Sequence, residues 1–320
     1  MIIVKSPFRI SLFGGSTDYK EFYQNYGSFL IGTTINKYCY LSMRYRPSIL
    51  SKQYLCTYSK YELVNTINEI QNPLIRETLN YFNINKPIEF FSFSDVPART
   101  GLGGSSSYCI GMIYLLCKLN NLSLSNKDII KSAIDIERNI LKESGGIQDQ
   151  IWPFAKGLNS IEIQKDGNFY TKPLPVTEEF NSEFEKSFTL IYTNEQRNTD
   201  VIAKSHENDV ENKLHILKFS KEAYSSFLQE DIKNIGNLLY ESWLYKNKIS
   251  PLISNTKINI IINDVMSMGA YGCKLLGSGG CGFILVISDP ITKTKIEQKY
   301  NGYVLNVNFE KIGTSEVFKN

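Results

Sequence analysis

A glycine- and serine-rich segment, residues 97–107 (PARTGLGGSSS), separates two apolar segments and restricts the local fold more than any other part of the chain. The preceding segment, Ile88–Val96, is rich in the aromatic and β-branched residues of strands, and the following one, Tyr108–Asn120, contains no proline. A strand, a glycine-rich turn and a helix start direct several backbone N–H groups and the positive end of the helix at one anion. This order predicts a cradle for the phosphates of a nucleotide and favours a small-molecule kinase.

The residue types within the cradle suit phosphate binding. Its glycines let the backbone approach a ligand where a Cβ atom would collide, and its serines fall in the first helical turn, where a hydroxyl can cap the helix, bind phosphate or ligate magnesium. The alternative is a flexible linker, but a linker is not usually flanked at once by two apolar elements. The predicted nucleotide-binding residues of this cradle are Pro97, Gly101, Leu102, Gly103, Gly104, Ser105, Ser106 and Ser107.

A second glycine segment, Gly277–Gly282 (GSGGCG), matches G-x-G-x-x-G by letter. It leads into Phe283–Ile287, which has the composition of a strand, whereas the dinucleotide-binding fold requires a helix there. The first segment lacks the lysine of the pattern G-x-x-x-x-G-K-[ST]. Neither a dinucleotide-binding fold nor a P-loop is therefore expected.

Bulk composition excludes several other classes. A chain of 320 residues and 36.6 kDa has room for one large or two ordinary domains, and a net charge of +3 without a basic, aromatic-interleaved run does not favour a nucleic-acid partner. Six cysteines without a C-x-x-C pair favour buried, reduced thiols over disulfides or a zinc site. Only two histidines, His206 and His215, are present, which argues against a histidine metal site or a Ser/His/Asp triad.

The N-terminal residues MIIVKSPFRI lack the apolar core and cleavage site of a signal peptide. The longest apolar run, Tyr108–Cys117, is about half the length that a bilayer requires. We therefore expect a soluble, cytoplasmic protein without a membrane partner.

Hydrophobic periodicity and turn residues predict an alternation of strands and helices. The expected strands are Ile2–Val4, Ile10–Phe13, Phe29–Arg46, Ile88–Val96, Ser160–Gln164, Phe169–Leu174, Phe188–Tyr192, Lys274–Leu276, Phe283–Ile287 and Tyr303–Phe309. The expected helices are Tyr61–Phe82 as two short pieces, Ser105–Asn120, Ser125–Lys142, most of Asp200–Asn247, Lys257–Met268 and Thr292–Tyr300. A polar stretch after Pro175 predicts a boundary between two domains, residues 1–176 and 177–320.

Three segments of the chain resemble, in the same order, the motifs of the GHMP kinase superfamily. They are residues 5–18 (KSPFRISLFGGSTD), the cradle, and residues 274–282 (KLLGSGGCG). The resemblance implies an α+β fold of two domains, a ribosomal-S5-domain-2-like N-terminal domain that binds ATP and a ferredoxin-like C-terminal domain, with the active site in the cleft between them. It also implies phosphoryl transfer from ATP with Mg²⁺. Residues 14–18, 101–106 and 145–150 further resemble the sugar-1-kinases that act on heptose 7-phosphate, as does the Ser-Trp pair at 242–243 followed by two lysines.

The resemblance assigns roles to four residues. Asp149 matches the aspartate that accepts the proton of the substrate hydroxyl, and Arg9 lies where a cation stabilises the charge of the transition state. Glu137 matches the magnesium-binding carboxylate, and Ser105 matches the serine that faces the metal ion. From residue type alone, Asp149 or Ser105 would be a helix cap, Glu137 a surface charge and Arg9 half of a structural ion pair.

Asp18 matches the aspartate that binds sugar hydroxyls in galactokinase-like members. Galactokinases have Gly-Glu-His-Thr-Asp at this place, whereas this chain has GGSTD, so two larger polar side chains are lost and space for a bulkier or charged sugar remains. Cations would meet a substrate phosphate, and the candidates are Arg197, Lys246 and Lys248. The predicted substrate-binding residues are Gly14, Gly15, Ser16, Thr17, Asp18, Gly277, Ser278, Gly279, Gly280, Arg197 and Lys246.

Together these features predict an ATP- and magnesium-dependent sugar kinase. It would phosphorylate an anomeric hydroxyl, with D-glycero-D-manno-heptose 7-phosphate as the first choice of substrate. The alternatives are a sugar-1-kinase for fucose, a uronic acid or an amino sugar, and a non-catalytic sugar or nucleotide sensor of the same fold. The protein is expected to be a monomer or a homodimer.

Overall fold

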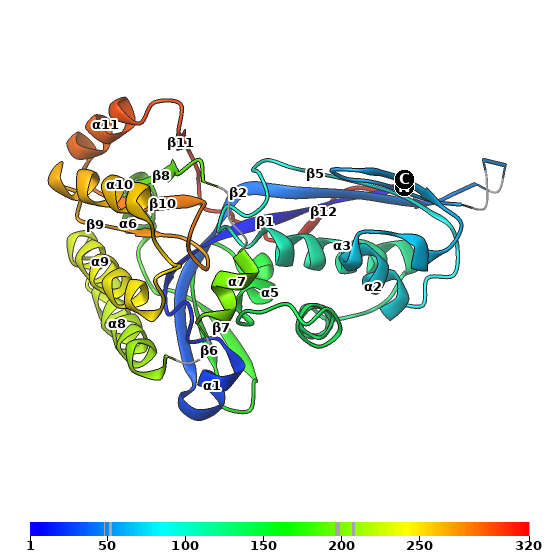
Figure 1. Cartoon of the computed structure of the whole chain (residues 1–320), viewed down its shortest axis with the longest axis horizontal. Helices are drawn as coiled ribbons and strands as arrows, with labels where there is room; N and C mark the ends of the chain where they lie inside the picture. Colours follow the sequence, from blue (N-terminus) through cyan, green and yellow to red (C-terminus); the bar gives the residue numbers. More distant parts are fainter. Residues whose placement is uncertain (48, 51–52, 196–198, 207–208, 320) are drawn as a thin grey trace.

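The computed structural model describes residues 1–47, 49–50, 53–195, 199–206 and 209–319. Its helices and strands form two units, each built on one β-sheet, which lie side by side in Figure 1. Among the described residues, no helix is both long and apolar enough to cross a bilayer.

The first sheet holds the elements that lead into the site. Its strand order is β12-β1-β2-β5-β3-β4, and β6 pairs with both β2 and β7. The long β2 makes this possible, because its first half pairs with β6 and its second half with β5. The strands are β1 (Ile2–Phe13), β2 (Ser28–Tyr45), β3 (Tyr54–Thr57), β4 (Tyr61–Val64), β5 (Ile88–Ser94), β6 (Leu158–Ile163), β7 (Phe169–Pro173) and β12 (Ser315–Lys319).

Helices cover one face of this sheet. The central one, α3 (Gly104–Asn120), packs on β1 and β2, and nearly all side chains between Ser106 and Cys117 are buried. Around it lie α2 (Pro73–Tyr81), α4 (Asn126–Ile134), the π-turn η2 (Asp135–Ile140) and α5 (Gln148–Ile151). The remaining short elements are α1 (Lys20–Tyr26) and the 3₁₀ turns η1 (Ile67–Glu69) and η3 (Trp152–Phe154).

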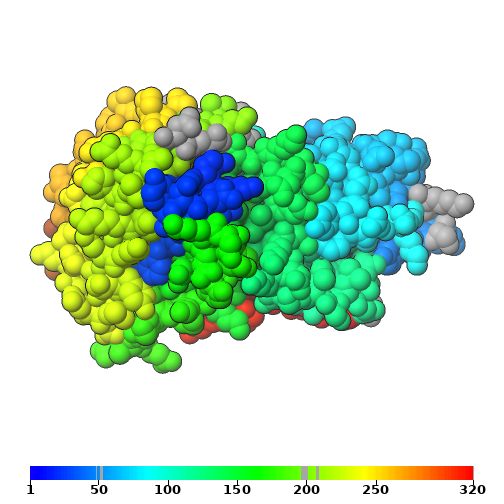
Figure 2. Space-filling view, turned by 90° about the horizontal axis from the view of Figure 1, so that it is seen from below, coloured from blue at the N-terminus to red at the C-terminus, as the bar shows by residue number. Residues whose placement is uncertain are grey.

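The second unit has a four-stranded antiparallel sheet of order β11-β8-β10-β9. Its strands are β8 (Phe188–Tyr192), β9 (Gly272–Leu275), β10 (Phe283–Ile287) and β11 (Val304–Leu305). Its helices are α6 (Glu178–Lys186), α7 (Thr199–Lys204), α8 (Val210–Leu228), α9 (Ile232–Ile249), α10 (Thr256–Ser267) and α11 (Pro290–Lys299). Helices α8 and α9 also contact β1, and in Figure 2 the dark blue α1 segment lies between this yellow-green helix pair and the green β6–β7 hairpin.

The expected elements differ from the observed ones where long-range pairing decides the structure. The N-terminal part of the expected helix pair Tyr61–Phe82 is the strand β4, because residues 61–64 pair with β3, and only α2 and η1 are helical. The two strands expected on either side of Pro7 are one strand, since the register shifts at Pro7/Phe8, where the missing proline N–H is tolerated. The expected strand Tyr303–Phe309 shrinks to β11, with a single further bridge from Phe309 to Ile35.

The expected boundary at residue 176 falls between β7 and α6 and stays a prediction. The last strand, β12, lies after this boundary in the sequence but belongs to the first sheet. It pairs with β1 and places Lys319 beside Ile2. A hydrophobic core that includes residues of both sheets joins the two units, for example Leu12 of β1 and Leu285 of β10.

Candidate active site

A cavity of about 640 Å³ lies between the two units and contains most of the predicted site residues. From the first unit it is lined by the cradle, the loop after β1, the π-turn η2 and the start of α5; from the second unit it is lined by α9, the glycine loop after β9 and residues around His206. Predicted residues that line it are Arg9, Gly15, Ser16, Asp18, Pro97, Gly101, Gly103, Gly104, Ser105, Ser106, Glu137, Asp149, Lys246, Gly277 and Ser278.

The two glycine segments pack against each other beside the N-terminus of α3. Gly101 and Gly277 both have a φ near +75°, and a Cβ atom on Gly101 would lie 2.5 Å from the carbonyl oxygen of Leu276. A Cβ atom on Gly277 would in turn lie 2.5 Å from Cα of Gly101. The second segment, which matched a dinucleotide motif by letter, therefore supports the cradle of the first.

The helix α3 starts without a side-chain cap, because its N-cap is Gly103 with φ 74° and ψ 26°. Four backbone N–H groups at a helix start have no partner within the helix, and the helix dipole makes this end positive. Since a Cβ on Gly103 would also press on Arg9, glycine keeps this end open toward the cavity. The geometry suits an anionic ligand such as a phosphate chain.

The three cradle serines have different surroundings. Ser105 is exposed to the cavity, whereas Ser106 is buried and donates to a carboxylate oxygen of Glu137 over 2.8 Å. Ser107 donates to the carbonyl of Pro7 and does not line the cavity. Leu102 is also buried and does not line the cavity. Leu102 and Ser107 therefore support the cradle on the side that faces away from the cavity.

Glu137 is fully buried at the cavity wall, on the π-turn. One carboxylate oxygen, Oε2, accepts hydrogen bonds from Ser106 and from Gln150, and the other, Oε1, is buried without a protein partner. Burial raises the pKa of Glu137 above its ordinary value. A buried carboxylate oxygen without a partner fits a cation ligand, since burying a charge that nothing compensates is costly.

The donor set suits magnesium rather than zinc. Among the described residues, no three His, Cys, Asp or Glu side chains come together as a metal site. Magnesium, however, usually takes one or two protein carboxylates and fills its other positions with water and substrate phosphates. Glu137 and the hydroxyl of Ser105 or Ser106, beside the phosphate cradle, fit that pattern.

Asp149 and Arg9 form the central ion pair of the site. Nε and Nη2 of Arg9 each donate to one oxygen of the Asp149 carboxylate over 2.8 Å, and Nη1 donates to the carbonyl of Gly101. The guanidinium is nearly buried, whereas the carboxylate is 26% exposed and faces the cavity. The structure thus brings the two predicted catalytic residues together, and Arg9 joins Asp149 to Gly101 of the cradle.

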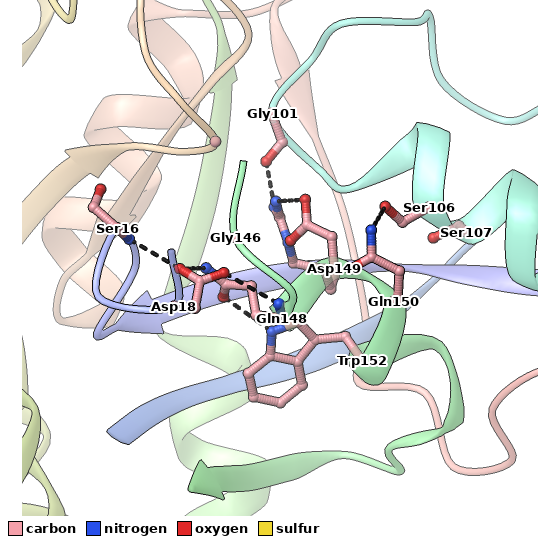
Figure 3. A network of polar contacts seen from close by, with 12 residues as sticks. Ser16, Asp18, Gly101, Ser106, Ser107, Gly146, Gln148, Asp149, Gln150 and Trp152 are labelled. Atoms are coloured by element: carbon pink, nitrogen blue, oxygen red, sulfur yellow. Dashed lines mark hydrogen bonds and ion pairs between the residues drawn. The ribbon is translucent and has the colours of Figure 1, made fainter. Parts of the chain in front are cut away.

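Asp18 also lines the cavity and is held by the segment before α5. Its carboxylate accepts from the backbone N–H groups of Ser16 and Gln148 and from the side-chain amide of Gln148 (Figure 3). Burial raises the pKa of Asp18, and the negative charge of Asp149 raises it further. A Cβ atom on Gly146 would lie 1.8 Å from the carboxylate, so only glycine fits there.

The innermost end of the cavity is rich in cations and hydroxyls. Lys246 is buried there and donates to the carbonyl of Gly277, and burial lowers its pKa to about 8. Lys274 crosses between the units to the carbonyls of Ser11 and Leu12, and the hydroxyl of Ser11 is buried without a protein partner. Among the described residues, no carboxylate forms an ion pair with either lysine, and burial lowers the pKa of Lys274 well below its ordinary value.

Some predicted substrate residues lie outside the cavity lining. The hydroxyl of Thr17 bonds the carbonyl of Gly14, whose own position admits no Cβ, so both shape the loop rather than face a ligand. Gly279 and Gly280 pack on Ile253. Lys248 lies over the ring of Tyr245, and Arg197 falls outside the described residues.

Sequence reasoning missed four polar residues of the site. Gln148 donates to the carboxylate of Asp18, and Gln150 donates to that of Glu137. Arg138 lines the cavity, and Nδ1 of His206 lies 2.9 Å from the hydroxyl of Ser16. The glutamines stand within the GGIQDQ segment, and the position of Asp149 between them is the signal that could have identified them. The role of His206 depends on a contact across 190 residues that no local pattern reveals.

Comparison with known proteins matches this geometry. The family models for the N-terminal and C-terminal domains of GHMP kinases match residues 65–157 and 223–302. A D-glycero-alpha-D-manno-heptose 7-phosphate kinase from Campylobacter jejuni is 30% identical over 98% of this chain and 97% of its own. The chain belongs to the GHMP kinase family. It is therefore a small-molecule kinase, a phosphotransferase with an alcohol group as acceptor, and GHMP kinases use ATP with Mg²⁺.

Solved structures confirm the two-domain α+β fold of a GHMP kinase. A D-glycero-D-manno-heptose 1-phosphate kinase from Bacteriodes thetaiotaomicron superimposes with a TM-score of 0.82 at 21% identity, covering 100% of both chains. A galactokinase from Lactococcus lactis superimposes with a TM-score of 0.74 at 15% identity, covering 99% of this chain and 94% of its own.

Proposed function

We propose that this GHMP kinase transfers the γ-phosphoryl group of ATP to the anomeric hydroxyl of D-glycero-D-manno-heptose 7-phosphate. The observation that carries the proposal is the Asp149 carboxylate, which Arg9 holds between the phosphate cradle and the Asp18 loop. The heptose 7-phosphate kinase that matches almost the whole chain supports the choice of acceptor. The product would carry an anomeric phosphate, which suits nucleotidyl transfer in nucleotide-sugar and surface-polysaccharide synthesis.

Asp149 would accept the proton of the attacking hydroxyl. A general base must lie within hydrogen-bond reach of the proton that it removes, and the exposed edge of this carboxylate faces the cavity beside the cradle. Arg9 fixes both carboxylate oxygens, so the aspartate is held in one orientation before the substrate binds. The same guanidinium places a fixed positive charge beside the cradle, where transfer of the phosphoryl group develops negative charge.

The cradle and Glu137 would hold the nucleotide and its metal ion. Gly101, Gly103 and Gly104 line the cavity, and their backbone N–H groups would bind the phosphates. Ser105, Ser106 and Glu137 would supply oxygen ligands to the metal ion. The Mg²⁺ ion held by these oxygens would supply positive charge against the negative charge that develops during transfer. Gln150 keeps the Glu137 carboxylate turned toward Ser106.

The acceptor would lie between Asp18 and the cation-rich inner end. Asp18 and Gln148 form the polar wall that would meet sugar hydroxyls. Lys246 and the unpartnered hydroxyl of Ser11 would bind the phosphate that the substrate already carries. The short Ser16, turned toward His206, leaves the space that a seven-carbon sugar phosphate needs.

A coupled ADP-release assay over a panel of sugars tests the proposal. The panel contains heptose 7-phosphate, the unphosphorylated heptose, fucose, galactose, a uronic acid and an amino sugar. We expect turnover of heptose 7-phosphate with a kcat/KM at least ~10²-fold above that of the unphosphorylated heptose, because Lys246 would otherwise stay buried without an anion. Turnover of an unphosphorylated sugar in preference to heptose 7-phosphate would contradict the choice of substrate, and no turnover of any sugar would favour a sensor.

A further inference from the structure

Glu137 lies on a π-turn, which is wider than the α-helix that precedes it. Helix α4 stops at Ile134 and the chain continues as the π-turn Asp135–Ile140, in which the N–H of Leu141 donates to the carbonyl of Ile136, five residues back. Single π-turns are rare and occur frequently at functional sites. This one places two consecutive charged side chains, Glu137 and Arg138, on the cavity wall.

Arg138 uses its guanidinium on backbone carbonyls rather than on a carboxylate at short range. Nε and Nη2 both donate to the carbonyl of Gly146, over 3.2 Å and 3.0 Å, and Nη1 donates to the carbonyl of Glu143 over 3.2 Å. Its nearest ion-pair contact, with the Glu143 carboxylate, is 4.0 Å. The planar guanidinium therefore clamps the loop that follows the π-turn at two points, the carbonyls of Glu143 and Gly146.

The loop held by Arg138 leads directly into α5, the helix that carries Asp149. On the other side of the Gly146–Ile147 peptide, the N–H of Ile147 donates to the backbone carbonyl of Asp18 over 3.1 Å. Helix α5 starts one residue later, with Asp149 in its first turn and Gln150 on Glu137. The side chain of Arg138 thus lies between the metal-binding carboxylate and the segment that carries the catalytic base.

We propose that Arg138 is a positioning residue, which fixes the catalytic segment relative to Glu137 through the carbonyl of Gly146. The proposal rests on the roles that the proposed function gives to Asp149 and Glu137. Residues 141–147 form no helix or strand, although backbone hydrogen bonds hold both ends of this segment, on the π-turn and on Asp18. The contacts of Arg138 with the carbonyls between these ends further restrict its conformational freedom.

Arg76 offers a matched control. It also combines a backbone contact, Nη1 to the carbonyl of Ile70 at 2.8 Å, with a carboxylate contact, Nε to Glu77 at 2.8 Å. It lies on α2 and does not line the cavity. R138M and R138K are compared with R76M and R76K for kcat, for KM of ATP and of the sugar, for melting temperature and for calorimetric affinity for ADP.

We expect R138M to lower kcat by ~10- to 100-fold while both KM values and the ADP affinity stay within about threefold, because the cradle and the Asp18 contacts remain. R138K should recover part of the loss, since an ammonium group can reach only one of the two carbonyls at a time. The Arg76 variants should keep kcat within about twofold, even where their melting temperature falls as far as that of R138M.

An R138M enzyme with kcat within twofold of the wild type would overturn the inference, as would a loss of kcat that the Arg76 variants reproduce at equal melting temperature. If R138M does not fold, R138K decides in the same way: a kcat loss of about fivefold or more at unchanged KM supports the inference, and an unchanged kcat overturns it. An inactive wild type contradicts both the proposed function and this inference, whereas an active wild type with an unaltered R138M contradicts this inference alone.

Discussion

Substitution of Glu137 by glutamine removes one negative charge from the cavity wall and keeps the shape of the side chain. Glu137 is fully buried, and its only hydrogen-bond donors among the described residues are Ser106 and Gln150. A glutamine carbonyl can accept both bonds, so the packing survives. The metal ion would lose its protein carboxylate, and we expect kcat/KM to fall by ~10² to 10³-fold.

The effect of this substitution on stability has a defined sign with pH. Burial raises the pKa of Glu137 in the folded protein above the ordinary 4.5. The contribution of the group to stability is therefore fully present below about pH 4.5 and is lost as the pH rises through the raised folded pKa, since the charged form is disfavoured inside the protein. E137Q does not undergo this loss, so its stability relative to the wild type should increase with pH.

The magnitude follows from the size of the shift. Each unit by which the folded pKa is raised corresponds to about 1.4 kcal/mol of stability that E137Q keeps and the wild type loses. Each kcal/mol moves the melting temperature of a chain of this size by about 2 °C. A buried amide without a partner costs ~1–3 kcal/mol at every pH, so the slope with pH and not the absolute difference is diagnostic.

Glu62 provides the matched control, because it is also a buried glutamate but lies outside the cavity lining. Burial opposes its ionisation, but hydrogen bonds from the Gln71 N–H and the Tyr58 hydroxyl outweigh burial and lower its pKa. That stabilisation is present above about pH 4.5 and is lost as the pH falls through the lowered folded pKa. E62Q should therefore be less stable than the wild type by a constant amount between pH 5 and 8, with unchanged kcat.

The assay records melting temperatures of the metal-free proteins from pH 5 to 8, together with steady-state kinetics at saturating magnesium. E137Q with kcat/KM within threefold of the wild type would refute the metal role of Glu137. A difference in melting temperature between E137Q and the wild type that stays flat over this pH range would refute the reasoning from burial.

Three further substitutions test other parts of the site. D149N should lower kcat by ~10³-fold or more in the ADP-release assay and leave calorimetric ADP binding within about threefold, whereas activity near the wild-type level would exclude a base at this position. K246M should raise KM for a phosphorylated sugar by ~10- to 100-fold, and K248M, on the same helix α9 but stacked on a tyrosine, should not; equal effects would remove the phosphate role of Lys246. G146A, whose Cβ would lie 1.8 Å from the Asp18 carboxylate, should lower the free energy of unfolding by ~2–4 kcal/mol in a denaturant titration, and a loss below 1 kcal/mol would show that the loop relaxes freely.

Local sequence signals predicted the strand and the helix on either side of the glycine turn, whereas the choice of Glu137 and Asp149 came from the resemblance to GHMP kinases. A strand, a glycine turn and a helix start within residues 88–120 leave little freedom, and the cavity gathers Ser105, Glu137 and Asp149 as expected. The GSGGCG loop was harder to interpret, because its glycines are required by contacts between segments far apart in the sequence. A Cβ atom on Gly277 would meet Gly101 of the cradle, and one on Gly279 would meet Ile253.

Features that depend on long-range contacts escaped prediction. The pairing of Ile2 with Lys319 joins the two ends of the chain, and residues 61–64 become a strand only because β3 lies beside them. The polar stretch after Pro175 gave no signal of the helix α6, whose Phe180 and Phe184 are buried in the core that includes residues of both sheets. The boundary expected at residue 176 stays a prediction. The clamp by Arg138 likewise depends on the orientation of one peptide plane, which no pattern of residue types specifies.

The central claim is that the Asp149 side of the cavity activates an anomeric hydroxyl. Phosphorus NMR of the product formed from ATP, Mg²⁺ and D-glycero-D-manno-heptose 7-phosphate tests it most directly. The account predicts one new phosphate resonance, coupled to the proton on C1 of the sugar, beside the original signal at C7, and its absence with D149N. A new phosphate on any other carbon, or the same product from D149N at the wild-type rate, would contradict the account.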